Sequence, residues 1–151
     1  GKVVLVASGG KKYHTNVFDA ATGKAVWKDS FSWGQDHHGG HMARPAIVNG
    51  EVYVRPRAYD LATGKVLKKS LPGGGCGTYA ATTGAFIFRS GNVTMWDRSN
   101  GKVTSWSRLR PDCWLSTIPA GGMLLSPEGG GGCSCGSWLE TSIGFIPVAR
   151  K

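Results

Sequence analysis

The stretch FDAATGK at residues 18–24 returns as YDLATGK at residues 59–65 and as WDRSNGK at residues 96–102. Each copy holds an aromatic residue, an aspartate, a short turn, a glycine and a lysine in the same order. The three aspartates, Asp19, Asp60 and Asp97, lie 41 and 37 residues apart. A recurrence about every 40 residues is typical of a repeat architecture, and it decides the fold before any other feature of the chain.

Each copy has the chemistry of a tight turn between two β-strands. An aspartate at the start of a turn can accept hydrogen bonds from backbone N–H groups two or three residues later. The glycine can take a positive φ without steric cost, and we expect the next strand to begin at the lysine. The repeats therefore predict hairpin turns between the two outer strands of small antiparallel sheets. We interpret the aspartates as turn residues and not as catalytic carboxylates.

Strand-like apolar runs surround these turns, and no segment of useful length has helical periodicity. The runs lie, in chain order, at residues 3–6, 17–18, 25–27, 45–48, 52–54, 80–81, 86–88, 117–120, 123–125 and 143–148. Each full repeat then has four short strands, which is the make-up of one propeller blade. The sequence predicts an all-β fold, a β-propeller fragment of about three and a half four-stranded blades.

The repeated phrase, with Trp27 four residues after Gly23, resembles the repeats of pyrroloquinoline-quinone-like (PQQ-like) β-propellers. The resemblance implies that Trp27 packs between neighbouring blades, as the corresponding tryptophan does in that family. The second copy departs from the pattern with Leu67 and Lys68 near that place, and the third has Trp106 one residue late.

The resemblance does not by itself imply a cofactor. Quinoprotein dehydrogenases of the family carry adjacent cysteines against PQQ, a calcium site of Glu and Asn, and a catalytic Asp. This chain has no Cys-Cys pair, and neither Glu128 nor Glu140 lies in a recognisable site. Many other members are non-catalytic scaffolds, so the fold says little about chemistry. The tail around residues 113–122 and 132–135 is similar to the C-terminal end of large secreted propeller proteins of planctomycete-like bacteria.

A chain of 151 residues is too short to form the roughly four to eight blades of a closed propeller. We therefore expect residues 1–151 to form a single partial propeller with blade turns at 19–24, 60–65 and 97–102. It would be the C-terminal part of a longer or assembled propeller. The expected partners are the remaining blades, from another part of the chain or from another subunit.

The chain carries a net charge of +9, which favours polyanionic surfaces as partners. The alternative is that its lysines are solvated charges at blade edges, where they discourage aggregation. No basic helix or interleaved aromatic-basic motif is present, so we do not expect a nucleic-acid partner. The sequence contains no membrane span, and its even count of four cysteines favours an extracytoplasmic location, periplasmic or secreted.

Three potential ligand residues occupy nearly equivalent places in the repeat. His41, Cys76 and Cys113 each precede the glycine of a first hairpin turn by eight or nine residues. If the first strand of a blade lines the central channel, these residues lie at one rim of that channel.

Two interpretations of this rim remain open. In one, Cys76 and Cys113 form a disulfide between adjacent blades, while Cys133 and Cys135 pair with each other or reach elsewhere. In the other, His41, Cys76 and Cys113 bind copper or zinc with the help of the neighbouring imidazoles. Those imidazoles belong to His37 and His38, in a glycine-containing loop. Besides these two interpretations, free thiols are the remaining alternative for the cysteines.

The candidates for a pocket at the same rim are Arg108, Arg110 and Trp114, which could line a site for an anionic or ring-shaped ligand. The alternative is that Trp114 packs between blades. The sequence has no recognisable nucleophile-base pair and no recognisable pair of carboxylates, so we assign no catalytic residues.

The leading functional hypothesis is a non-catalytic extracytoplasmic β-propeller module that acts as a binding or assembly scaffold. One alternative is part of an oxidoreductase that uses PQQ, copper or zinc at the channel rim. Another is a structural subunit that assembles through open blade edges.

Overall fold

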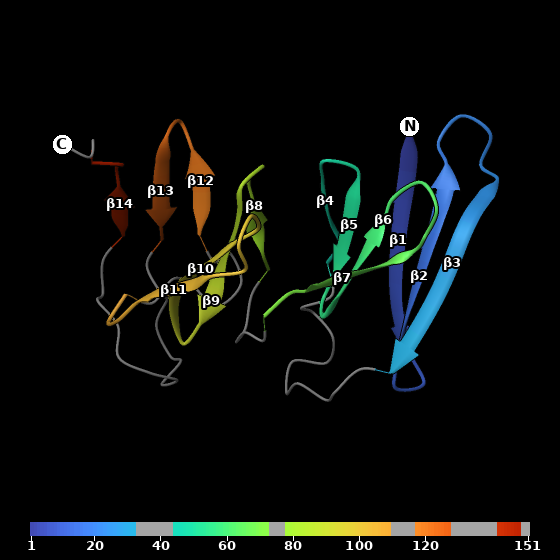
Figure 1. Ribbon diagram of the computed structural model, residues 1–151, viewed down its shortest axis with the longest axis horizontal. Coiled ribbons are helices and arrows are strands. Elements are labelled where there is room, and N and C mark those ends of the chain that lie inside the picture. The colour runs from blue at the N-terminus through green and yellow to red at the C-terminus, as the bar shows by residue number, and fades with distance from the viewer. Residues whose placement is uncertain (33–43, 73–77, 110–116, 128–141, 149–151) are drawn as a thin grey trace. The chain divides into compact units, whose positions relative to one another are not determined.

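The computed structural model describes residues 1–32, 44–72, 78–109, 117–127 and 142–148. These residues form four antiparallel β-sheets of three or four strands and contain no helix. The chain divides into two compact units, Gly1–Gly73 and Gly74–Lys151, with two sheets in each. The all-β, blade-like architecture predicted from the repeats is confirmed (Figure 1).

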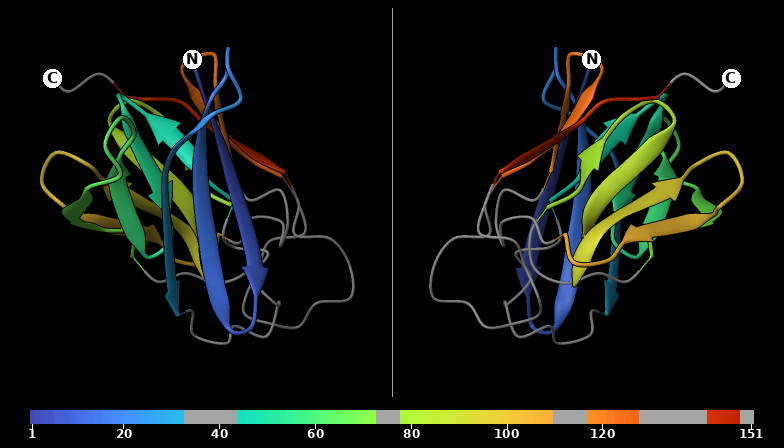
Figure 2. Two further views of the ribbon diagram at one scale, coloured as in Figure 1. Left: turned by 90° about the vertical axis from the view of Figure 1, so that its right-hand side faces the viewer. Right: turned by 90° about the vertical axis from the view of Figure 1, so that its left-hand side faces the viewer.

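The first unit holds two sheets. The first sheet has the order β1-β2-β3, and its strands are β1 (Lys2–Gly9), β2 (Lys12–Asp19) and β3 (Ala25–Ser32). Both views of Figure 2 show these three as long, adjacent strands. The second sheet has the order β4-β5-β6-β7, and its strands are β4 (Ala46–Val48), β5 (Glu51–Val54), β6 (Arg57–Asp60) and β7 (Val66–Ser70).

The second unit repeats the pattern. The third sheet has the order β11-β10-β9-β8, with strands β8 (Ala80–Ala81), β9 (Ala85–Ser90), β10 (Asn92–Asp97) and β11 (Val103–Trp106). The fourth sheet comprises β12 (Ile118–Ala120), β13 (Met123–Ser126) and β14 (Ile143–Phe145). The last strand ends earlier than the predicted run 143–148, in which Pro147 has no N–H to donate to a strand ladder.

The three repeated turns form the predicted hairpins, joining β2 to β3, β6 to β7 and β10 to β11. Gly23, Gly64 and Gly101 all have a positive φ, of 68°, 74° and 74°. In each turn the glycine N–H donates to the aspartate carbonyl at 2.9 Å. The following strand begins one residue after the lysine and not at it, because the lysine backbone still belongs to the turn, where its carbonyl accepts from the aspartate N–H.

Alternation along β1, β2 and β3 gives the first sheet two distinct faces. The inner face contributes Tyr13 and Phe31 to a core shared with the second sheet. That core also contains Val52, Val54 and Tyr59 of the second sheet, with partly buried Val4, Val6, Trp27 and Leu61 packed against it. The outer face is the opposite side, and it bears Val3, Leu5, Ala7, His14, Asn16, Phe18, Lys28 and Ser30.

Candidate functional site: a filled junction and its open counterpart

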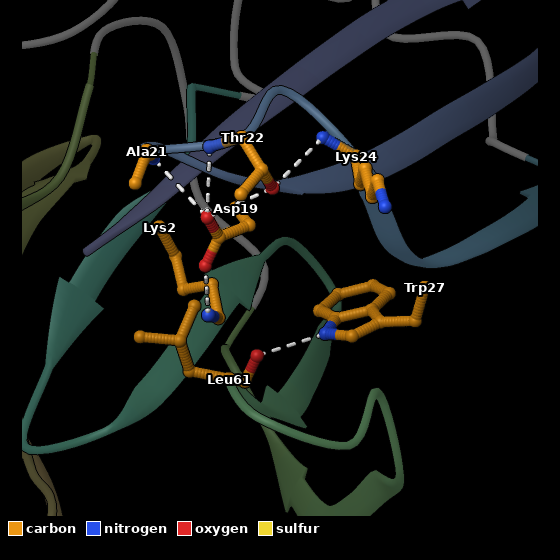
Figure 3. Close-up of polar contacts among 7 residues, drawn as sticks. All are labelled: Lys2, Asp19, Ala21, Thr22, Lys24, Trp27 and Leu61. Atoms are coloured by element: carbon orange, nitrogen blue, oxygen red, sulfur yellow. Dashed lines mark hydrogen bonds and ion pairs between the residues drawn. The ribbon is translucent and has the colours of Figure 1, made fainter.

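The junction between the first two sheets centres on Trp27 of β3. Its indole Nε1 donates a hydrogen bond of 2.8 Å to the carbonyl of Leu61, as Figure 3 shows. Its ring lies 5.2 Å from the Tyr59 ring between centroids, tilted by 32°. The indole also covers Gly64 so closely that a Cβ on that glycine would lie 2.7 Å from Trp27 Cγ and Cδ2. Glycine is therefore required at position 64 for two reasons, its positive φ and the packed indole.

A carboxylate two residues later on β3 completes the junction. Asp29 lies on the same side of the strand as Trp27, and its Oδ2 accepts hydrogen bonds of 2.8 Å from both Arg57 Nη1 and Tyr59 Oη. The Arg57 guanidinium carbon also lies 4.6 Å from the centre of the Phe31 ring. The strand thus presents an aromatic residue, a carboxylate and a second aromatic residue, Trp27, Asp29 and Phe31, to the second sheet.

Tyr59 is the buried member of this junction. Burial, followed by the hydrogen bond and charge of Asp29, raises the pKa of Tyr59 to about 12. Its side chain is completely buried. A phenol in such a place acts as a neutral hydrogen-bond donor to the carboxylate.

Part of the first sheet corresponds to the second sheet in its backbone hydrogen bonds. The N–H of Ala20 donates to the Gly1 carbonyl, as the N–H of Leu61 donates to that of Gly50. Counting along the strands from these anchors, residues 2–5 of β1 correspond to β5, and residues 16–19 of β2 correspond to β6. Phe18 then corresponds to Tyr59, Asn16 to Arg57, Gly23 to Gly64, Val3 to Val52 and Leu5 to Val54.

The equivalent residues differ sharply in exposure. Val52 and Val54 have no exposed surface, because the inner face of the first sheet covers them. Val3 and Leu5, at the same positions of the first sheet, are 52% and 55% exposed. A Cβ on Gly23 would meet no atom within 4 Å. The outer face of the first sheet is therefore the open counterpart of a surface that is filled in the second sheet.

The part of the outer face nearest the β1–β2 hairpin is polar and contains a shallow depression. A depression of about 410 Å³ is lined by His14, Asn16, Lys28, Asp29 and Ser30. The strand register pairs His14 with Ser30 and Asn16 with Lys28. The carboxylate of Asp29 itself belongs to the inner face, where it is bonded to Arg57 and Tyr59.

The repeated aspartates are structural, as predicted. Oδ1 of Asp60 accepts from the backbone N–H and the hydroxyl of Thr63 at 2.8 and 2.7 Å, and these bonds lower the pKa of Asp60. Bonds from Ser99 lower the pKa of Asp97 in the same way.

The first turn adds an ion pair to this arrangement. Lys2 Nζ lies 3.0 Å from Oδ2 of Asp19, and this contact, followed by bonds from Thr22, holds the pKa of Asp19 far below its usual range (Figure 3). Each carboxylate thus accepts hydrogen bonds within its own turn, as expected of a capping residue.

The second unit contains a related aromatic contact with a different register. Trp106 stacks on Phe145 of β14 with 6.5 Å between ring centroids. Trp106 pairs with Val93, which is the place that Asp29 takes opposite Thr15 in the first sheet. Because β3 contains a bulge before Trp27 and β11 does not, Trp106 is the equivalent of Asp29 by register and not of Trp27.

Apart from Arg108, the predicted ligand, disulfide and pocket residues lie outside the described residues. They are His37, His38, His41, Cys76, Cys113, Cys133, Cys135, Arg110 and Trp114. The disulfide, copper, zinc and PQQ hypotheses accordingly stay predictions. Within the ranges that the structure describes, no three His, Cys, Asp or Glu side chains lie together as a metal site.

Sequence reasoning missed Asp29, Arg57 and the exposed pair Val3 and Leu5. The signal for Asp29 was present, since residues two apart on a strand share a face and Asp29 follows Trp27 by two. No comparable local signal links Asp29 to Arg57, which lies on another sheet.

No protein-family model matches the chain, and no curated protein matches it. Among the described residues there is no helix with the length and apolar character needed to cross a membrane.

Proposed function

We propose that this protein is a non-catalytic β-propeller module, of the PQQ-like repeat family and located outside the cytoplasm, that works as an assembly scaffold. Its assembly surface is the outer face of the first sheet, which takes up a further blade. The observation that carries this proposal is the contrast between Val52 and Val54, which are buried by a neighbouring sheet, and Val3 and Leu5, which are half exposed at equivalent positions.

The energetics favour covering this face. Burying a valine or leucine completely contributes roughly 1.5–3 kcal/mol. Since Val3 and Leu5 already bury about half of their surface, covering them adds about 1 kcal/mol each. Phe18, at the place of the fully buried Tyr59, is also only partly buried and adds to this sum.

The same arrangement argues for a scaffold and against a reaction centre at this place. The aspartates of the turns are committed to backbone and side-chain bonds within their own turns. The junction carboxylate, Asp29, accepts from two neighbours. What the described surface offers a partner is apolar area, hydrogen-bond donors and room above Gly23.

The proposal can be tested by supplying a blade of known structure. Residues 1–44 are repeated ahead of Gly1, so that the added copy presents its own β3 to the outer face of the original first sheet. The original 151 residues alone carry ¹⁵N, and amide hydrogen exchange is followed by nuclear magnetic resonance. We expect exchange in β1 and β2 of the original copy to slow at least about tenfold, because docking stabilises the sheet against opening.

A matched pair of substitutions controls this test. Leu5→Lys in the original copy should abolish the added protection, because a lysine would be buried against the incoming blade. Val103→Lys serves as the control, since Val103 is 49% exposed on another sheet, and it should leave the protection intact. Unchanged exchange in the extended protein would refute the proposal.

A further inference from the structure

We infer that the strand by which the received blade packs on the outer face, where the family resemblance already implies a tryptophan, carries aspartate or glutamate two residues after that tryptophan. This inference rests on the proposed function and names the chemistry of the partner strand. It follows from the contact between the first and second sheets, called the filled junction below, where Trp27 and Asp29 form this pair on one side of β3.

The tryptophan that the family resemblance implies fits the space above the first turn. In the filled junction, the indole lies on Gly64 and bonds to the carbonyl of the residue after the turn aspartate, Leu61. The first sheet has a glycine of the same conformation at position 23 with no atom within 4 Å of its Cβ position. The equivalent carbonyl belongs to Ala20, and the aromatic ring that would contact the incoming indole belongs to Phe18.

The carboxylate is indicated by hydrogen-bond donors on the same face, nearer the β1–β2 hairpin. Asn16 takes the place of Arg57, and Lys28 lies directly across from it on the neighbouring strand. His14 and Ser30 form the next cross-strand pair. None of these four side chains makes a hydrogen bond or ion pair within the part of the chain that the structure describes. A carboxylate that the incoming strand places here therefore has hydrogen-bond donors within the same surface. They are the Asn16 amide, the Lys28 ammonium, the His14 imidazole and the Ser30 hydroxyl.

The spacing of the two groups is set by the geometry of a strand. Side chains two residues apart point to one side of a strand and lie about 6.5–7 Å apart along it. In the filled junction this separation brings the indole to Gly64 and the carboxylate to Arg57. The same step on the outer face leads from Gly23 and Phe18 to Asn16 and Lys28, so a strand with the Trp-x-acid pattern can satisfy both halves at once.

The inference is tested in the extended protein by changing the receiving face at Lys28, whose side chain is exposed. Lys28→Glu in the original copy should lower the protection of β1 and β2 about tenfold or more, because it sets a like charge against the incoming Asp29. Asp29→Lys in the added copy should lower it similarly. Combining the two substitutions should restore most of the protection, since the ion pair is reversed.

Further variants separate the failure of this inference from that of the proposed function. Ser32→Ala in the original copy is the control, and it should leave protection unchanged, since Ser32 lies at the far end of β3. If the unsubstituted added copy slows exchange but Lys28→Glu has no effect, docking stands and the carboxylate requirement is wrong. If Trp27→Leu in the added copy leaves protection unchanged, the indole requirement is wrong. If the unsubstituted copy has no effect at all, the proposed function itself fails.

Discussion

Alanine substitution at Gly64 and Gly23 should separate the cost of a positive φ from the cost of a filled junction. Both glycines occupy the same position of the same turn, with φ of 74° and 68°. An alanine in this conformation costs about 1–2 kcal/mol, offset in part by the reduced freedom of the unfolded chain, roughly 0.4–1 kcal/mol. Gly23→Ala should therefore lower the free energy of unfolding by about 1 kcal/mol.

Gly64→Ala should cost considerably more. Its Cβ would lie 2.7 Å from Trp27 Cγ and Cδ2 and 3.0 Å from Cε3. Withdrawal of the indole would stretch the 2.8 Å bond from its Nε1 to the Leu61 carbonyl. Overpacking of this kind costs typically 1–3 kcal/mol, so we expect a total loss of about 2–4 kcal/mol for Gly64→Ala.

Urea unfolding, followed by circular dichroism, measures the difference. With a slope of about 2 kcal/mol per molar urea, the midpoint of Gly64→Ala should lie about 1 M below that of Gly23→Ala. The double variant Trp27→Ala, Gly64→Ala should lose the excess, which gives a coupling energy of about 1–3 kcal/mol. Equal costs for the two glycine substitutions, or no coupling to Trp27, would refute the packing argument.

Three further outcomes follow from the same contacts. Trp27→Ala should destabilise the first unit by about 3 kcal/mol, the lower end for a large aromatic truncation, and a urea midpoint within 0.3 M, roughly, of the parent would contradict this. Hydrogen bonds from Thr63 lower the pKa of folded Asp60, so the stabilisation from this carboxylate is present above roughly pH 4 and is lost as the pH falls. Asp60→Asn should therefore reduce the loss of unfolding free energy at acidic pH. An unchanged loss would count against the role assigned to this turn. Because burial raises the pKa of folded Tyr59 to about 12, stability should decline as the pH rises from 10 towards 12, and Tyr59→Phe should weaken that decline in urea titrations across this range.

Much of the fold could be predicted from three short phrases. The positions of Asp60 and Gly64 in the second copy, and of their equivalents, define the turns, and the apolar runs between them define the strands. These predictions succeed because turn chemistry and strand alternation are local properties of the chain. The contact of Trp27 with the second sheet was implied by family resemblance and not by any local pattern.

The exposure of the outer face of the first sheet could not be predicted, because a side chain's exposure depends on whether another sheet packs over it. Val3 and Val52 are both valines on strands, and nothing in their neighbouring sequence distinguishes one from the other. The structure separates them by placing a sheet over Val52. The predicted histidine and cysteine sites depend on residues such as His41 and Cys76, which lie outside the described residues.

The most direct test of the open-face account places Gly23→Ala in two contexts. In the chain of 151 residues, its Cβ meets no atom within 4 Å, so only the cost of the positive φ is expected, about 1 kcal/mol. In the extended protein, the indole of the added blade should cover Gly23 as Trp27 covers Gly64, and the same substitution should cost about 1–3 kcal/mol more. An equal cost in both contexts, measured by urea unfolding, would contradict the claim that the outer face of the first sheet receives a blade.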